Sequence, residues 1–265
     1  MMANFALKTL PIPPFRRVRA LSCRHLAVLL SALPALTHAQ GGPPMVTDDP
    51  DTPGDGRWEI NIASIGSHTP GRFDLTAPDA DINYGWGDHV QLNLDIAWDL
   101  ANERDNGWTS GLSEARFGVK WRFLDREQAG VSLSTYPQLL QNILGASVRR
   151  GLATPGKQFY LPVQISGDAG EFGLDGEIGH TFVQSGPDQW AAGFIVAHDC
   201  GAGFYCRLEI RETRVPHDSQ TLVNFGWTHK LTESLNFLGA VGRDLGPATA
   251  DRQSVLFYLG VQIVR

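Results

Sequence analysis

The sequence predicts an all-β protein: a closed antiparallel transmembrane β-barrel of about 12 strands that follows a cleaved signal peptide. Three observations support this fold class. Segments of 10–12 residues alternate between apolar and polar side chains, which is the pattern of a half-buried strand. Their length matches the roughly 9–11 residues with which a tilted strand crosses a bilayer. Tight and longer connections alternate between the segments, as they do in bacterial outer-membrane barrels.

Residues 1–39 have the organisation of a secretory signal peptide. They contain five basic residues and no acidic residue, then an apolar stretch of 11 residues (26–36) and the small-x-small sequence Thr37-His38-Ala39. We expect export and cleavage after Ala39, with a basic amphipathic helix as the alternative. Removal of this segment leaves 17 basic and 28 acidic residues, a formal charge near −11. This charge argues against a nucleic-acid partner, because phosphate binding needs a basic surface.

Residues 40–56 form a Pro/Asp-rich segment ahead of the first strand. Four carboxylates, those of Asp48, Asp49, Asp51 and Asp55, lie within eight residues, and oxygen ligands at this density suit Ca²⁺. The segment lacks the spaced Asp-x-Asp-x-Asp-Gly pattern with a closing Glu, however. We therefore expect no metal here, and either a periplasmic segment or a plug folded into the barrel.

Residues 57–265 are predicted to form the barrel itself. Residues 90–98 place Val, Leu, Leu, Ile and Trp on one face and Gln, Asn, Asp and Ala on the other, and residues 114–123 alternate in the same way. The same reading gives twelve strands: 57–66, 78–85, 89–98, 112–123, 129–141, 157–168, 171–182, 189–198, 203–215, 219–229, 234–244 and 253–264. The connections 99–111, 142–156 and 245–252 are expected to be long loops.

Tryptophan positions separate this barrel from a secreted β-sandwich, which shows the same alternation. Five of them lie near a predicted strand end on an apolar face, namely Trp58, Trp98, Trp121, Trp190 and Trp227. Such placement is typical of the aromatic girdles at the two membrane interfaces. Strand length and tryptophan position together favour the barrel.

Several phrases of the sequence resemble a known family. They are Asp81-Ile-Asn-Tyr-Gly85, Val90-Gln-Leu-Asn-Leu94, Gly118-Val-Lys-Trp-Arg-Phe-Leu-Asp125 and Tyr160-Leu-Pro-Val163, after the segment 44–54. In this order they resemble the outer-membrane transporter family associated with the meta-cleavage pathway of phenol degradation. The resemblance implies an outer-membrane barrel that passes small hydrophobic or aromatic molecules. It carries over no substrate-binding residue.

Charged residues on the polar faces are the candidates for lining the lumen. They fall into three sets, each on one predicted strand, and sequence alone does not say which sets face each other. The candidates are Glu114, Arg116, Lys120 and Arg122; Glu171, Asp175 and Glu177; and Arg207, Glu209 and Arg211. Such charges either pair across the lumen and fill it or line a narrow polar pore.

The sequence shows little sign of catalysis. His180 and His198 are the best candidates for a general base, but no nucleophile elbow or spaced metal-ligand pair accompanies them. Cys200 and Cys206 flank a tight turn, and export places them in an oxidising compartment. A disulfide is therefore expected, with two free thiols as the alternative.

These observations together predict a monomeric outer-membrane channel for small molecules, with no catalytic residue, metal or cofactor. Its expected partners are membrane lipid, the barrel-insertion machinery and an unidentified small molecule. A sealed barrel with a structural or adhesion role and a membrane-embedded hydrolase are the alternatives.

Overall fold

The structure is a computed structural model that describes residues 42–246 and 252–265. The predicted signal peptide, 1–39, lies outside the described residues. The strands are β1 (Trp58–Thr69), β2 (Arg72–Trp86), β3 (Val90–Glu103), β4 (Gly107–Leu112), β5 (Glu114–Leu124), β6 (Val131–Thr135), β7 (Gln138–Asn142), β8 (Lys157–Ala169), β9 (Phe172–Val183), β10 (Gln189–Gly201), β11 (Phe204–Val215), β12 (Asp218–Lys230), β13 (Leu235–Leu245) and β14 (Val255–Val264). Two short helices, α1 (Arg126–Ala129) and α2 (Gly145–Arg149), lie in connections.

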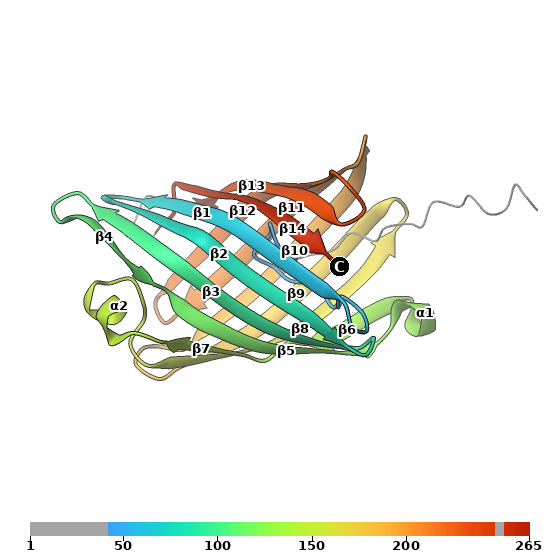
Figure 1. Ribbon diagram of the computed structural model, residues 1–265, viewed down its shortest axis with the longest axis horizontal. Coiled ribbons are helices and arrows are strands. Elements are labelled where there is room, and N and C mark those ends of the chain that lie inside the picture. The colour runs from blue at the N-terminus through green and yellow to red at the C-terminus, as the bar shows by residue number, and fades with distance from the viewer. Residues whose placement is uncertain (1–41, 247–251) are drawn as a thin grey trace, which may run out of the picture. The chain divides into compact units, whose positions relative to one another are not determined.

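The fourteen described strands form a barrel that is twelve strands around (Figure 1). β4 and β5 both pair with β3, so they are one strand interrupted at Ser113. β6 and β7 both pair with β5 and β8, and they are one strand interrupted at Tyr136 and Pro137. Antiparallel pairing of β1 with β14 closes the ring. The predicted fold class is confirmed.

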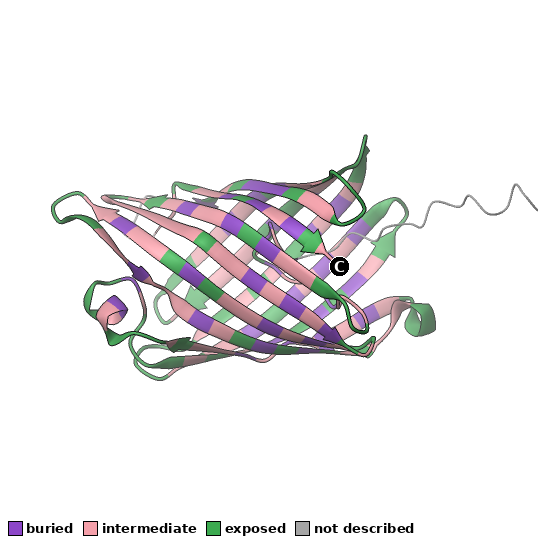
Figure 2. Cartoon of the chain, viewed as in Figure 1, coloured by how far each residue is buried: buried purple, intermediate pink, exposed green. Residues whose placement is uncertain are grey.

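Buried residues alternate with more exposed ones along the strands (Figure 2). On β5 the Val119 side chain is 46% exposed, whereas the neighbouring Lys120 is 2% exposed. Most large apolar side chains on the strands are exposed, and most fully buried side chains are polar. This is the arrangement of a protein whose outer face meets lipid and whose interior is polar.

The two ends of the barrel differ in their connections. The end that carries the 143–156 connection and α2 is called the loop end, and the opposite end, where β1 begins and α1 lies, is called the turn end. Within the described residues no helix is long and apolar enough to cross a bilayer.

Three strand boundaries differ from prediction. β1 and β2 run on to a tight turn at residues 70–71, because a bulge between Thr76 and Asp79 interrupts the alternation that would have revealed β2. Pro78 lies in this bulge. A sheet tolerates proline at a bulge because the missing N–H is not needed there for strand pairing. The expected loop 99–111 is instead the hairpin of β3 and β4, with only residues 104–106 outside the strands. The predicted strand 129–141 is divided by Pro137.

Cys200 and Cys206 form a disulfide across the turn between β10 and β11. Their separation of six residues makes the closed loop short, so the bond removes little entropy from the unfolded chain. We expect the paired substitution Cys200→Ser with Cys206→Ser to lower the free energy of unfolding by less than the ~3 kcal/mol of a 15-residue loop. Urea unfolding of the barrel in detergent measures this. Rapid maleimide labelling of exported wild type without reductant would contradict the disulfide.

Candidate functional site: the polar lumen and the segment inside it

Residues 42–56 lie against the lumen-facing side chains of the barrel. The segment begins with a turn in which the Gly42 amide donates to the Thr47 carbonyl over 2.9 Å. The Glu209 carboxylate of β11, which has 0% exposure, then accepts the Thr47 amide at 2.5 Å and the Val46 amide at 3.2 Å. Asn224 of β12 donates to the same carboxylate over 3.1 Å. Hydrogen bonds that involve a charged group are the stronger ones, so Glu209 is a firm attachment point.

The other attachment point is on β5, nearly opposite β11 in the ring. Lys120 Nζ donates to Asp48 Oδ1 at 3.1 Å, the Asp49 carbonyl at 2.7 Å and the Asp51 carbonyl at 3.2 Å. Arg122 adds an ion pair to Asp51 at 3.3 Å. The three protons of the ammonium are thus all used on the segment. Residues 46–51 therefore bridge the lumen from β11 to β5.

Glycines in the wall make room for the segment. A Cβ on Gly193 would lie 1.9 Å from Thr47 Oγ1, and one on Gly226 would lie 2.3 Å from the Met45 sulfur. A Cβ on Gly85 would meet the Gly54 carbonyl oxygen at 1.8 Å. A side chain at any of these three wall positions would displace the backbone or side chain now packed there.

Nine of the ten predicted lumen residues lie on β5, β9 or β11, with side chains that are buried or half-buried. Glu171 does not. It occupies the two-residue turn between β8 and β9 and is exposed, because β8 runs to Ala169, one residue further than predicted, and the chain reverses at Gly170, with φ +66°, and Glu171 itself. The prediction of Glu171 as a lumen residue is wrong.

The structure connects two of the predicted sets directly. Glu177 of β9 pairs with Arg211 of β11 at 2.8 Å. Tyr160 and Gln164 of β8 donate to the same carboxylate at 2.7 Å and 3.0 Å. Glu114 instead reaches the loop end, where it accepts the Thr154 amide at 2.6 Å. Some of the charged residues therefore connect neighbouring parts of the barrel by ion pairs and hydrogen bonds.

A further polar group on β1, β2 and β3 was not among the predicted site residues. Asp81 accepts hydrogen bonds from the amides of Asn61, Asn83 and Asn93 at 2.6–3.1 Å. Asp95 pairs with Arg116 of β5. Its sequence signal was the polar half of the alternation in residues 79–83 and 91–95, which contains no basic residue.

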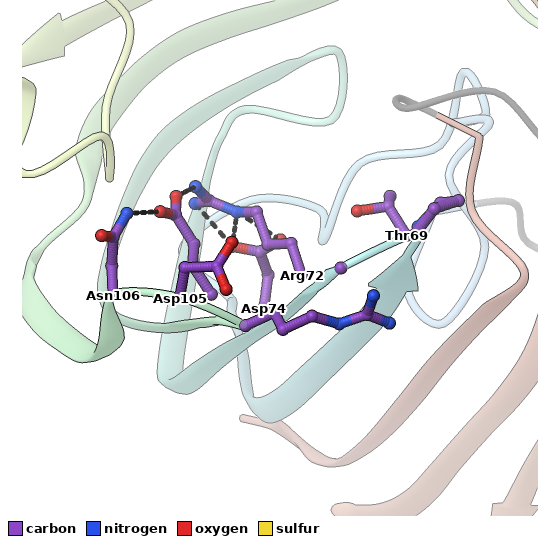
Figure 3. A pocket seen from close by; sticks show the side chains of 9 residues that line it. Thr69, Arg72, Asp74, Asp105 and Asn106 are labelled. Atoms are coloured by element: carbon purple, nitrogen blue, oxygen red, sulfur yellow. Dashed lines mark hydrogen bonds and ion pairs between the residues drawn. The ribbon is translucent and has the colours of Figure 1, made fainter.

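One pocket lies at the loop end, between the β1–β2 and β3–β4 turns (Figure 3). It measures about 590 Å³ and is lined by residues 69–72, 74 and 103–106. Arg72 is held inside it by Asp74 and Glu103 at 2.7 and 2.8 Å. Its charge is therefore committed to the protein itself.

The two candidate general bases face outward at opposite ends of the barrel. His180 packs against Phe182 and Trp190, with ring centroids 4.4 Å and 4.6 Å apart. His198 lies beside Phe172 at 5.0 Å, near the turn end. Both side chains thus lie on the outer face near a strand end, which is where a barrel meets the membrane–water interface. Among the described residues no group of three His, Cys, Asp or Glu side chains could hold a metal ion.

Comparisons with known proteins identify the fold. No family model matches the chain, and no curated protein matches it. Among solved structures, an outer membrane channel from Pseudomonas putida F1 aligns with a TM-score of 0.60 at 12% identity, over 82% of this chain and 98% of that one. The NanC porin aligns with a TM-score of 0.55 at 8% identity, and the KdgM porin with 0.52 at 9%; each alignment covers 77% of this chain and 98% of the porin. The chain therefore has the fold of a twelve-stranded outer-membrane β-barrel.

Proposed function

We propose that the protein is an outer-membrane channel for small molecules. The observation that carries this proposal is the inversion of polarity: the outer face of a closed barrel is apolar and its lumen is lined by charged and amide side chains. An apolar outer face of this kind is stable only when it is in contact with lipid. Buried lumen atoms without a hydrogen-bond partner, such as the amide oxygens of Asn61 and Asn93, would be costly in a barrel that served only as an anchor.

Residues 42–56 act in this proposal as a plug of the lumen. Their attachments to β5 and β11 use the Lys120 ammonium, the Arg122 guanidinium and the Glu209 carboxylate, together with the fit at the wall glycines. These are a few local contacts, which can be exchanged without opening a strand pair. Passage through the barrel would then require the plug to shift.

The molecules that pass are proposed to be small and hydrophobic or aromatic, after the resemblance to the transporter family of the phenol meta-cleavage pathway. We further propose that the protein is a monomer in the lipid of the outer membrane, and that the outer-membrane assembly machinery inserts it. An adhesion or purely structural role remains the second candidate, because the plug in its present position blocks part of the lumen.

Planar-bilayer recording of a wall variant tests channel and plug together. Gly193→Ala adds a Cβ that would lie 1.9 Å from Thr47 Oγ1 and 2.9 Å from Thr47 Cβ, so the plug segment must shift. We expect discrete conductance steps from the wild type and larger steps from this variant. Gly145→Ala is the matched control, because its Cβ would meet only Arg149 Nη1, at 3.7 Å, and it should conduct like the wild type. Silent bilayers from all three proteins, with folded barrels confirmed by altered gel mobility before boiling, would favour the sealed structural barrel.

A further inference from the structure

The lumen faces of β2 and β3 form a strongly acidic stripe. The two strands contain six acidic residues and one basic residue, and all six carboxylates are on the lumen side: Asp74, Asp79, Asp81, Asp95, Asp99 and Glu103. Arg72 neutralises one end of the stripe by contacts with Asp74 and Glu103. Arg116, from β5, lies near Asp95 and Asp81. Six carboxyl groups thus face two basic side chains.

Among the described residues, Arg116 is the one basic side chain that pairs with the middle of the stripe. Neither Asp79 nor Asp99 makes an ion pair within the part of the chain that the structure describes. Asp79 shares a hydrogen bond with the Asp95 carboxyl group, and Asp99 accepts one from the Thr76 hydroxyl at 2.7 Å. Asp81 and Asp95 are directly opposite each other in the β2–β3 pair. Like charges in this position repel, so a stripe of this kind attracts a positive charge from the lumen.

Two buried amide oxygens point to the same kind of ligand independently of the charges. Asn61 is 1% exposed and Asn93 is 6% exposed, and both give their NH₂ groups to Asp81. The carbonyl oxygen of each of these side chains has no hydrogen-bond partner. A buried acceptor without a donor is costly. Two acceptors without a donor, in a stripe with more carboxyl groups than basic side chains, suit a ligand that donates several hydrogen bonds.

We propose that the acidic stripe on β2 and β3 is a binding track for an ammonium group, so that the molecules admitted by the barrel include small organic amines in their charged form. An ammonium offers up to three N–H donors and one positive charge, which fits a surface of carboxylates and neutral amide oxygens. The track runs from the loop end to Asn83, two residues before the contact of Gly85 with the plug segment. A bound amine is thus delivered to the plug. This inference rests on the proposed channel function and narrows its substrate class.

The test uses Asp79→Asn with Asp99→Asn, which removes the two carboxylates that lack an ion pair and keeps their shape. Glu233→Gln is the matched control, because it removes a carboxylate from the exposed β12–β13 turn. In a KCl gradient across a planar bilayer we expect the wild type and the control to prefer cations. The double variant should lose about threefold in the cation-to-anion permeability ratio. An unchanged ratio would overturn the inference while leaving the channel function intact.

A second measurement does not depend on conductance. Ethylammonium chloride should raise the temperature at which the wild-type barrel unfolds in detergent above that in KCl of equal ionic strength, because a ligand of the folded state stabilises it. The double variant should lose this difference, and the control should keep it. Equal stabilisation by potassium would show a general cation site and overturn the assignment to amines. No conductance together with a preserved ethylammonium effect would contradict the channel and uphold the binding track.

Discussion

Deletion of residues 42–52 should raise the single-channel conductance of the barrel about fivefold or more, since it removes the chain that bridges the lumen between β5 and β11. The deletion ends before Gly54, so the hydrogen bonds of residues 54–57 with each other and with Gly85 are retained at the start of β1. The strand ladders are untouched, and the barrel should still migrate differently on a gel before and after boiling. Planar-bilayer recording gives the conductance.

Thr47→Val is the matched control for this deletion. It keeps the shape of the side chain that packs on Gly193, and it removes only the 3.3 Å contact of the hydroxyl with Arg211. We expect wild-type conductance from it. Equal conductance of the deletion variant and the wild type would show that residues 42–52 do not limit passage, and the plug proposal would be wrong.

Val119→Arg should destabilise the folded barrel by about 2–4 kcal/mol, because Val119 faces outward on β5 and an arginine there meets hydrocarbon near the middle of the bilayer. Val119→Leu is the control and should have little effect, since it keeps an apolar side chain on the lipid face. Urea titrations of the refolded barrel in lipid vesicles compare the two. Equal unfolding midpoints for both variants would refute the assignment of faces on β5.

The neighbouring Lys120 should respond differently. Its ammonium is buried and contacts only the plug segment and the lumen side of the barrel. Lys120→Gln leaves the Asp48 carboxylate and two carbonyl oxygens with fewer donors, so the main loss is attachment of the segment. We therefore expect Lys120→Gln to raise the single-channel conductance in planar bilayers while the barrel stays folded. Val119→Arg, in contrast, should lower the stability of the barrel.

The architecture could be predicted from the sequence where alternation runs without interruption. β3, β5 and β14 alternate residue by residue, and their face assignments follow from that pattern. The prediction stopped short at residues 67–77, where the Pro78 bulge shifts the register by one position and exchanges the two faces. A pattern with period two cannot be followed across such a shift.

The site was less accessible to sequence reasoning, because its contacts join residues far apart in the chain. The predicted charges on β5 and β11 include both attachment points of the plug, Lys120 and Glu209. Nothing local to either residue indicates that its partner is a backbone group 69–163 residues away. Alternation identifies which side chains enter the lumen, and only the closed ring determines which of them meet. The acidic stripe needed a second step as well, since its excess charge appears only when β2 and β3 are combined.

The position of residues 42–56 also constrains the order of assembly. This segment precedes β1 in the chain, yet it contacts β11, which is synthesised more than 150 residues later. β14 is the last strand to be synthesised, so its pairing with β1 is the step that closes the ring. After closure the ring has no strand edge through which a folded loop could enter sideways. The amino-terminal segment can therefore enter only before the seam closes, or along the barrel axis from the turn end, where β1 begins. A long insertion ahead of β1 should slow maturation of the barrel more than an equally long insertion in the 143–156 connection.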